Sequence, residues 1–114
     1  MRVHKAETFV ESDTWEIQGV LHYADGSPFN LGAGCNIVWG MEDSTGSVVL
    51  ELSLGSGIVV LDASAGTCLI TVSPTQSQAI GAGNYTDQLQ ATDPTGYVST
   101  QWTGPINVVK SFFA

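Results

Sequence analysis

The side chains that could take part in catalysis or metal binding are few in this chain and lie far apart. His4 and His22 are the only histidines, and neither has a cysteine or a second histidine at the spacing of a zinc site. Acidic residues in predicted turns could bind calcium, although turn formation is the ordinary role of aspartate at such positions. These acids are Asp25, Glu42, Asp43, Asp62 and Asp93. We therefore expect no metal and no other cofactor.

Covalent and acid–base catalysis have no better support. A nucleophilic site needs a base held beside a serine or a cysteine. Cys35 and Cys68, the only cysteines, each lie in a segment of alternating apolar residues and are expected in the core. Paired carboxylates for glycoside hydrolysis could be chosen from the acids of almost any acidic domain, and no spacing distinguishes a pair here. The sequence predicts a protein that is not an enzyme.

The two cysteines also indicate whether the protein belongs in an oxidising or a reducing environment. Residues 1–5 lack the apolar core of a secretion signal. Because disulfides belong mainly to secreted proteins, two free and buried thiols are the expected state. A fold of two sheets could still bring Cys35 and Cys68 together, so a disulfide stays an alternative.

Composition and charge describe a folded, acidic protein. Of its 114 residues, 43% are hydrophobic and 12% charged, which excludes a disordered tail. Eleven acids against three bases give a net charge of -8, and three bases between Arg2 and Lys110 cannot form the basic patch that nucleic acid requires. The same deficit disfavours anionic membranes, and no apolar run approaches the roughly 18 residues of a bilayer span. We expect neither nucleic acid nor a membrane as partner.

Short apolar segments separated by glycine, proline and aspartate predict a chain of β-strands. Apolar and polar residues alternate over most of them, as in half-buried strands. The expected strands cover about residues 3–10, 14–23, 35–42, 47–54, 57–62, 66–73, 84–93, 96–103 and 105–110. Residues 74–80 lack this alternation and predict one helical or 3₁₀ turn that uses Ile80 as an apolar plug.

The number and spacing of these strands predict the fold class. Seven to nine short strands at intervals of about 8–12 residues are typical of an immunoglobulin-like antiparallel β-sandwich, and a small barrel is the alternative. At this length the chain is expected to be a single domain, residues 1–114. No element remains to cover the edge strands, which makes the strand edges candidate contact sites.

Apolar side chains in loops and at the end of the chain are the candidate assembly contacts. Phe112 and Phe113 either complete the core of this domain or dock into a neighbouring subunit. The loop with Phe29 and Leu31 is expected to fold onto the core. Trp102 follows a polar run and is expected to be exposed. The candidate contacts are Phe29, Leu31, Trp102, Phe112 and Phe113.

A carbohydrate-binding or adhesion module is the alternative function, with a host surface glycan as its ligand. Aromatic rings can stack on the faces of sugars, and the candidate rings are Trp15, Tyr23, Trp39, Tyr85, Tyr97 and Trp102. Trp15 and Trp39 lie in register with aliphatic residues and are expected in the core. Trp102 alone would be a small platform.

Several segments of the chain show further patterns of turn residues and apolar spacing. They include an Asp-Gly-Ser-Pro turn followed by a loop with leucine, a strand pair split by Ala-Gly, and a Gly-x-Tyr strand. The segments are Asp13-Thr14-Trp15, Ala24 to Leu31, Gly57 to Asp62 with Ala65-Gly66, Gly83-Asn84-Tyr85, Pro94 to Val98 and Gly104 to Val108. Over about residues 12–109 these segments resemble the β-sandwich domains of tailed-phage structural proteins, above all the N-terminal domain of baseplate upper proteins.

The resemblance implies a virion component that is assembled in the host cytoplasm. Such a protein would build or decorate a tail, baseplate, neck or head through contacts with other virion proteins and with copies of itself. The resemblance implies no catalytic residues. Baseplate upper proteins continue after this domain, whereas this chain stops at Ala114, so a small adaptor or decoration protein is the expected form.

Overall fold

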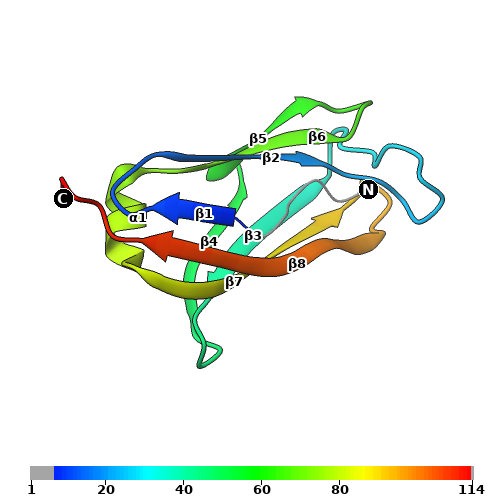
Figure 1. Cartoon of the computed structure of the whole chain (residues 1–114). Helices are drawn as coiled ribbons and strands as arrows, with labels where there is room; N and C mark the ends of the chain where they lie inside the picture. Colours follow the sequence, from blue (N-terminus) through cyan, green and yellow to red (C-terminus); the bar gives the residue numbers. More distant parts are fainter. Residues whose placement is uncertain (1–6, 114) are drawn as a thin grey trace.

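The structure is a computed structural model that describes residues 7–113, in which the regular secondary structure is mostly β-strand. Eight strands and one helix follow in the order β1 (Glu7–Val10), β2 (Trp15–Val20), β3 (Asn36–Glu42), β4 (Val48–Leu54), β5 (Gly57–Asp62), β6 (Thr67–Val72), α1 (Pro74–Ile80), β7 (Gly83–Thr92) and β8 (Val98–Val109). The strands form one sheet in the order β1-β8-β7-β3-β4-β5-β6-β2, which is nearly closed into a barrel (Figure 1). The expected all-β class and number of strands are confirmed. Of the opening strand expected at 3–10, residues 3–6 lie outside the described residues.

The sheet is mixed, whereas the sequence predicted an antiparallel one. β1 runs parallel to β8 and begins with Glu7 opposite Ile106. β5 runs parallel to the end of β4 over only two residue pairs, the second of which joins Leu54 to Ile58. Alternation of apolar residues predicts which face of a strand is buried, but it carries no information on the direction of the neighbouring strand. The prediction was therefore wrong on this point.

Two strands expected at 96–103 and 105–110 are one continuous strand, β8. The predicted break at Gly104-Pro105 does not occur, and Pro105 lies opposite Thr86 of β7. Within residues 7–113, β1 pairs with β8 only from Ile106 onward. Among the described residues, the part of β8 up to Pro105 therefore forms an edge, which is where a sheet tolerates a residue without an N–H group.

Helix α1 occupies the segment that was predicted to be helical. Ser73 caps its N-terminus, because its hydroxyl accepts the N–H of Gln76 (3.2 Å) while the Gln76 amide oxygen accepts the N–H of Ser73 (2.9 Å). Pro74 fills the first helical position, where no N–H is needed. At the other end Ile80 is partly buried and packs against the core, as expected.

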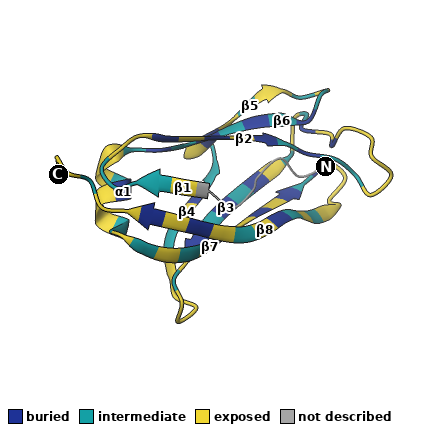
Figure 2. Ribbon diagram, viewed as in Figure 1, coloured by how far each residue is buried: buried dark blue, intermediate teal, exposed yellow. Residues whose placement is uncertain are grey.

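The core runs through the interior of the curled sheet. Buried residues alternate with exposed or half-buried residues along β2, β3, β6 and β7, so that one face of each strand points inward (Figure 2). The inward side chains form one cluster: Trp15, Ile17, Leu21, Phe29, Leu31, Ile37, Trp39, Met41, Leu52, Ile58, Cys68, Ile70, Val72, Leu89, Ala91, Trp102, Ile106 and Val108. The core positions expected for Trp15, Trp39 and Cys68 are confirmed.

The turn between β5 and β6 requires glycine at Gly66. Its φ is +72°, and a Cβ atom there would lie 2.6 Å from the carbonyl oxygen of Leu21. That close approach lets the N–H of Leu21 donate to the carbonyl of Gly66 (2.8 Å). The N–H of Phe29 in turn donates to the carbonyl of Leu21 (2.9 Å), so the turn anchors the loop after β2.

Candidate functional site

Two of the predicted contact residues, Phe29 and Leu31, lie in the core, which confirms the expectation that their loop folds onto it. The loop that carries them folds over one end of the sheet, where the N–H of Leu31 donates to the carbonyl of Ala63 (3.2 Å). The ring of Phe29 stacks on Tyr23, with 4.6 Å between the ring centroids. Burying these two apolar side chains within their own chain removes them from the candidate contacts.

Trp102 is also buried, with 3% of its surface exposed, which corrects the expectation that it faces solvent. Its indole N–H donates to Oδ2 of Asp87 (2.8 Å), and the indole N–H of Trp39 donates to the same oxygen (2.8 Å). The polar run before Trp102 misled the prediction, because this residue occupies an inward position of β8. With Trp15 and Trp39 in the core as well, no tryptophan ring is available as a platform for sugars.

Asp87 is a fully buried carboxylate that the sequence analysis did not single out. Leu89, the next inward residue of β7, lies opposite Trp39 on one side and opposite Trp102 on the other. Both indoles are therefore diagonal neighbours of Asp87 on the same face of the sheet. The signal in the sequence was an aspartate at an inward position of an alternating strand. The arrangement joins β3, β7 and β8 through one polar group inside the core.

The C-terminal aromatic pair, Phe112 and Phe113, lies in solvent, unlike the buried Asp87. Phe112 and Phe113 are 98% and 97% exposed, so the alternative in which they complete the core of this domain is not what the structure shows. One hydrogen bond joins this segment to the rest of the fold, from the N–H of Ser111 to Oε1 of Glu11 (3.3 Å), and the N–H of Phe113 donates to the Ser111 hydroxyl (3.1 Å). The two exposed phenyl rings remain candidate contacts for a partner.

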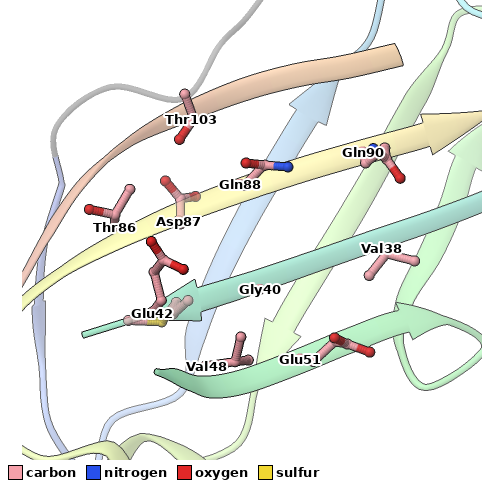
Figure 3. A pocket seen from close by; sticks show the side chains of 11 residues that line it. Val38, Gly40, Glu42, Val48, Glu51, Thr86, Asp87, Gln88, Gln90 and Thr103 are labelled. Carbon is pink, nitrogen blue, oxygen red and sulfur yellow. The ribbon is translucent and has the colours of Figure 1, made fainter. Parts of the chain in front are cut away.

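A pocket of about 300 Å³ lies across β3, β4, β7 and β8 (Figure 3). Gly40 of β3 leaves room near its centre, and Val38 and Val48 contribute apolar surface. Hydrogen-bonding side chains surround it: Glu42, Glu51, Thr86, Gln88, Gln90 and Thr103. The pocket can bind a small polar group through amide, hydroxyl and carboxylate oxygens. Sequence reasoning missed it, although the outward polar residues of β7, which alternate with its core residues, were a usable signal.

Four of the acids considered as calcium ligands instead cap their own turns. Each aspartate is followed two residues later by a serine or threonine whose N–H and hydroxyl both donate to its Oδ1 atom. The pairs are Asp25 with Ser27, Asp43 with Thr45, Asp62 with Ser64, and Asp93 with Thr95. These bonds lower the pKa of all four carboxyls, and the Thr95 and Tyr23 hydroxyls lower that of Asp93 to about 2. Within residues 7–113 no group of three or more potential ligands gathers as a metal site.

The thiols are free, as expected. Cys35 is partly buried and Cys68 is fully buried. Burial raises the pKa of the Cys68 thiol to about 11, and burial also raises the pKa of Cys35. Because the thiolate is the reactive form, neither cysteine has the environment of a nucleophile.

No family model matches the chain, and no curated protein matches it. Over the described part of the chain, no helix is long and apolar enough to cross a membrane.

Proposed function

We propose that this chain is a non-enzymatic structural component of a phage particle, at the tail, baseplate, neck or head, which acts by protein–protein assembly. The observation that carries the assembly role is the exposure of Phe112 and Phe113. Burial of these two apolar side chains against a partner would remove both rings from water. The likeness of the turn sequences to tailed-phage domains supports the proposal that the protein is part of a phage particle.

The partners in this proposal are other virion proteins and copies of the same chain. A net charge of -8 disfavours the phosphate backbone of nucleic acid and limits non-specific association. Contacts therefore depend on local apolar patches that the acidic surface leaves uncovered. The terminal pair is the most exposed of these patches.

Peptide mass spectrometry on gradient-purified particles tests whether this chain is part of a phage particle. Its copy number is scaled to the major capsid and tail-tube proteins. Recovery in fixed proportion to those proteins is the expected result. Absence from particles would overturn the proposal.

The test of the terminal pair compares Phe112→Ser/Phe113→Ser with Val98→Ser. Val98 is also exposed but lies at the start of β8, at the other end of the strand from the terminal pair. Both variants should unfold like the wild type, because none of these side chains is buried. Only the terminal variant should lose incorporation into particles. Equal incorporation of the two variants would remove the terminal rings from the assembly model.

We also propose that the curled sheet is an immunoglobulin-like sandwich, with β1, β8, β7, β3 and β4 as one layer and β5, β6 and β2 as the other. The two-pair junction between β4 and β5 supports this division. A second support is Tyr85, near the start of β7, whose hydroxyl donates to the carbonyl of Ile80 (2.8 Å). Immunoglobulin-like domains carry such a tyrosine corner two residues before a core cysteine, the position that Asp87 holds here.

Carbohydrate binding is the second candidate, and the pocket on β3, β4, β7 and β8 is the observation that favours it. Its amides, hydroxyls and carboxylates could bind the hydroxyl groups of a host glycan without an aromatic platform. A glycan array probed with the wild type and with Gln88→Ala/Gln90→Ala tests this candidate. Binding that the double variant loses would favour it, and no binding to any glycan would remove it.

A further inference from the structure

Gly40 lies within the pocket on β3, β4, β7 and β8, where no side chain fills the space above the sheet. Its φ lies outside the left-handed region, so the backbone conformation of β3 does not require glycine. A Cβ atom at this position would have a single atom within 4 Å, the carbonyl oxygen of Leu50 at 3.2 Å. Glycine inside a strand weakens the sheet and often marks a place where a ligand approaches the backbone closely. Gly40 thus leaves room for a group from outside the chain.

The residues opposite Gly40 carry polar side chains that the fold does not use. Glu51 of β4 lies opposite it on one side, and Gln88 of β7 lies opposite it on the other. Residues opposite each other in an antiparallel pair share a face of the sheet, so both side chains flank the space above Gly40 (Figure 3). Glu42 and Gln90 line the pocket from the next outward positions of β3 and β7. Within the described part of the chain, none of these four side chains takes part in a hydrogen bond or an ion pair of the fold.

The pocket carries negative charge without a positive group to balance it. Glu42 and Glu51 contribute two carboxylates. Lys110 is the only lysine or arginine among the described residues, and it does not line the pocket. The net charge of -8 adds an attraction for cations around the whole protein. These charges disfavour phosphates, carboxylates and acidic sugars as ligands, and they favour a cationic group.

We propose that the pocket binds the guanidinium group of an arginine side chain that a partner protein presents. A guanidinium has five N–H donors in a flat fork and no acceptor, whereas a lysine ammonium is a compact charge with three donors. The fork suits acceptors that are spread over three strands, Glu42 on β3, Glu51 on β4 and Gln88 on β7. The methylene groups of the arginine can pack against Val38 and Val48, which give the pocket apolar surface.

The accessibility of the pocket fits a contact between proteins. Glu42, Glu51, Gln88 and Gln90 are exposed, so a side chain that projects from another protein can reach them. Ion pairs at exposed positions are weak because water and salt screen them. One arginine should therefore bind in about the millimolar range, as one contact within a larger interface. The inference extends the proposed assembly role to a surface other than the terminal rings, and it holds whether or not the chain belongs to a phage particle.

Amide chemical shifts of the isotope-labelled full chain, titrated with N-acetyl-arginine amide, test the inference. Residues 38–42 and 86–90 should show shifts that saturate, with a dissociation constant in about the millimolar range. N-acetyl-citrulline amide is the matched control probe, because it replaces the guanidinium by a neutral group of nearly the same shape, and it should leave these shifts unchanged. Equal responses to the two probes, or no response to the arginine probe, would overturn the inference.

Substitution distinguishes this pocket from other acidic positions. Glu51→Gln removes one carboxylate with little change in the size of the side chain, and it should raise the dissociation constant for the arginine probe by about two- to fivefold. Glu16→Gln is the control variant, since Glu16 is also an exposed glutamate on a strand, and it should bind like the wild type. Equal affinities of the two variants would contradict the inference.

Two further results separate this inference from the functions proposed above. Neutral monosaccharides that shift the same amides when the arginine probe does not would overturn the inference and favour the glycan candidate. Absence of the chain from phage particles would contradict the proposed function but leave arginine binding unchanged, so the two failures are distinguishable.

Discussion

The indole N–H groups of Trp39 and Trp102 donate to the same atom, Oδ2 of Asp87, each at 2.8 Å. The three residues come from neighbouring strands, β3, β8 and β7, and the carboxylate lies between the two rings. Removing a buried acceptor that two donors share takes one hydrogen bond from each of them. In this domain a polar group thus has a structural role in the core.

Replacing Asp87 should therefore destabilise the protein strongly. Asp87→Ala leaves two buried indole N–H groups without their acceptor, at a cost of about 2–6 kcal/mol in the free energy of unfolding. Asp87→Asn keeps an acceptor oxygen and should cost less. Urea denaturation followed by tryptophan fluorescence measures both. Gln88→Ala, at the adjacent exposed position of β7, should stay within about 0.5 kcal/mol of the wild type. Equal stability of Asp87→Ala and Gln88→Ala would contradict this role.

Gly66→Ala and Gly46→Ala should separate steric conflict from backbone strain. Both glycines have positive φ, +72° and +87°, so alanine at either position costs about 1–2 kcal/mol in backbone strain. A Cβ at Gly46 has no atom within 4 Å, whereas a Cβ at Gly66 collides with the backbone of Leu21 and Phe29. We expect Gly66→Ala to be the more destabilising by at least about 2 kcal/mol. Thermal unfolding of the two variants makes the comparison, and equal losses would show that the turn adapts.

Acid should weaken the contact between Asp93 and Tyr23. Hydrogen bonds from Thr95 and Tyr23 lower the pKa of Asp93 from 3.8 to about 2. A carboxyl whose pKa is lowered by folding contributes stability that is complete above its unfolded pKa and declines as the pH falls toward the folded value. The contribution should thus be constant above about pH 5 and be lost between about pH 4 and 2. NMR titration of the carboxyl carbon gives the pKa directly, and Tyr23→Phe should raise it. An unchanged value in Tyr23→Phe would assign the shift to Thr95 and to the backbone N–H of Tyr97, which donates to Oδ1 of Asp93 (3.0 Å).

The cysteines should differ in their accessibility to alkylation. Cys68 is fully buried and its pKa is raised to about 11, so iodoacetamide should modify it only when the chain unfolds. Cys35 is partly buried and should react slowly in the native protein. Peptide mass spectrometry with and without urea measures both rates, and Cys35→Ser isolates the signal of Cys68. Modification of Cys68 at the same rate in both states would contradict its burial.

The sequence predicted the strands well because a half-buried strand has a local signature. Alternation identified β2, β3, β6 and β7, and the absence of alternation identified α1. Strand direction and the continuity of β8 through Pro105 could not be predicted, because they depend on which distant strand lies alongside. The parallel contact between β1 and β8 joins Glu7 to Ile106, and no local pattern encodes it.

The contact residues were harder to predict than the strands. Phe29, Leu31 and Trp102 were chosen because apolar residues stood among polar or turn residues, yet each fills space in the core that strands from other parts of the chain enclose. Phe112 and Phe113 are instead almost fully exposed. The sequence left open whether these two rings are buried in their own domain, because burial depends on how the whole sheet assembles. Asp87 escaped notice for a related reason, since its two donors come from β3 and β8.

The parallel pairing of the first and last strands determines how this domain carries mechanical load. β1 and β8 run in the same direction, from one end of the molecule toward the other (Figure 1). A pull on the chain ahead of β1 and behind β8 therefore draws the two strands in opposite directions along their length. The hydrogen bonds between them are then loaded in shear and must break together, whereas a hairpin pulled at its open end parts one bond at a time. Tension transmitted along the backbone would accordingly meet its main resistance at the four residue pairs from Glu7 to Val10.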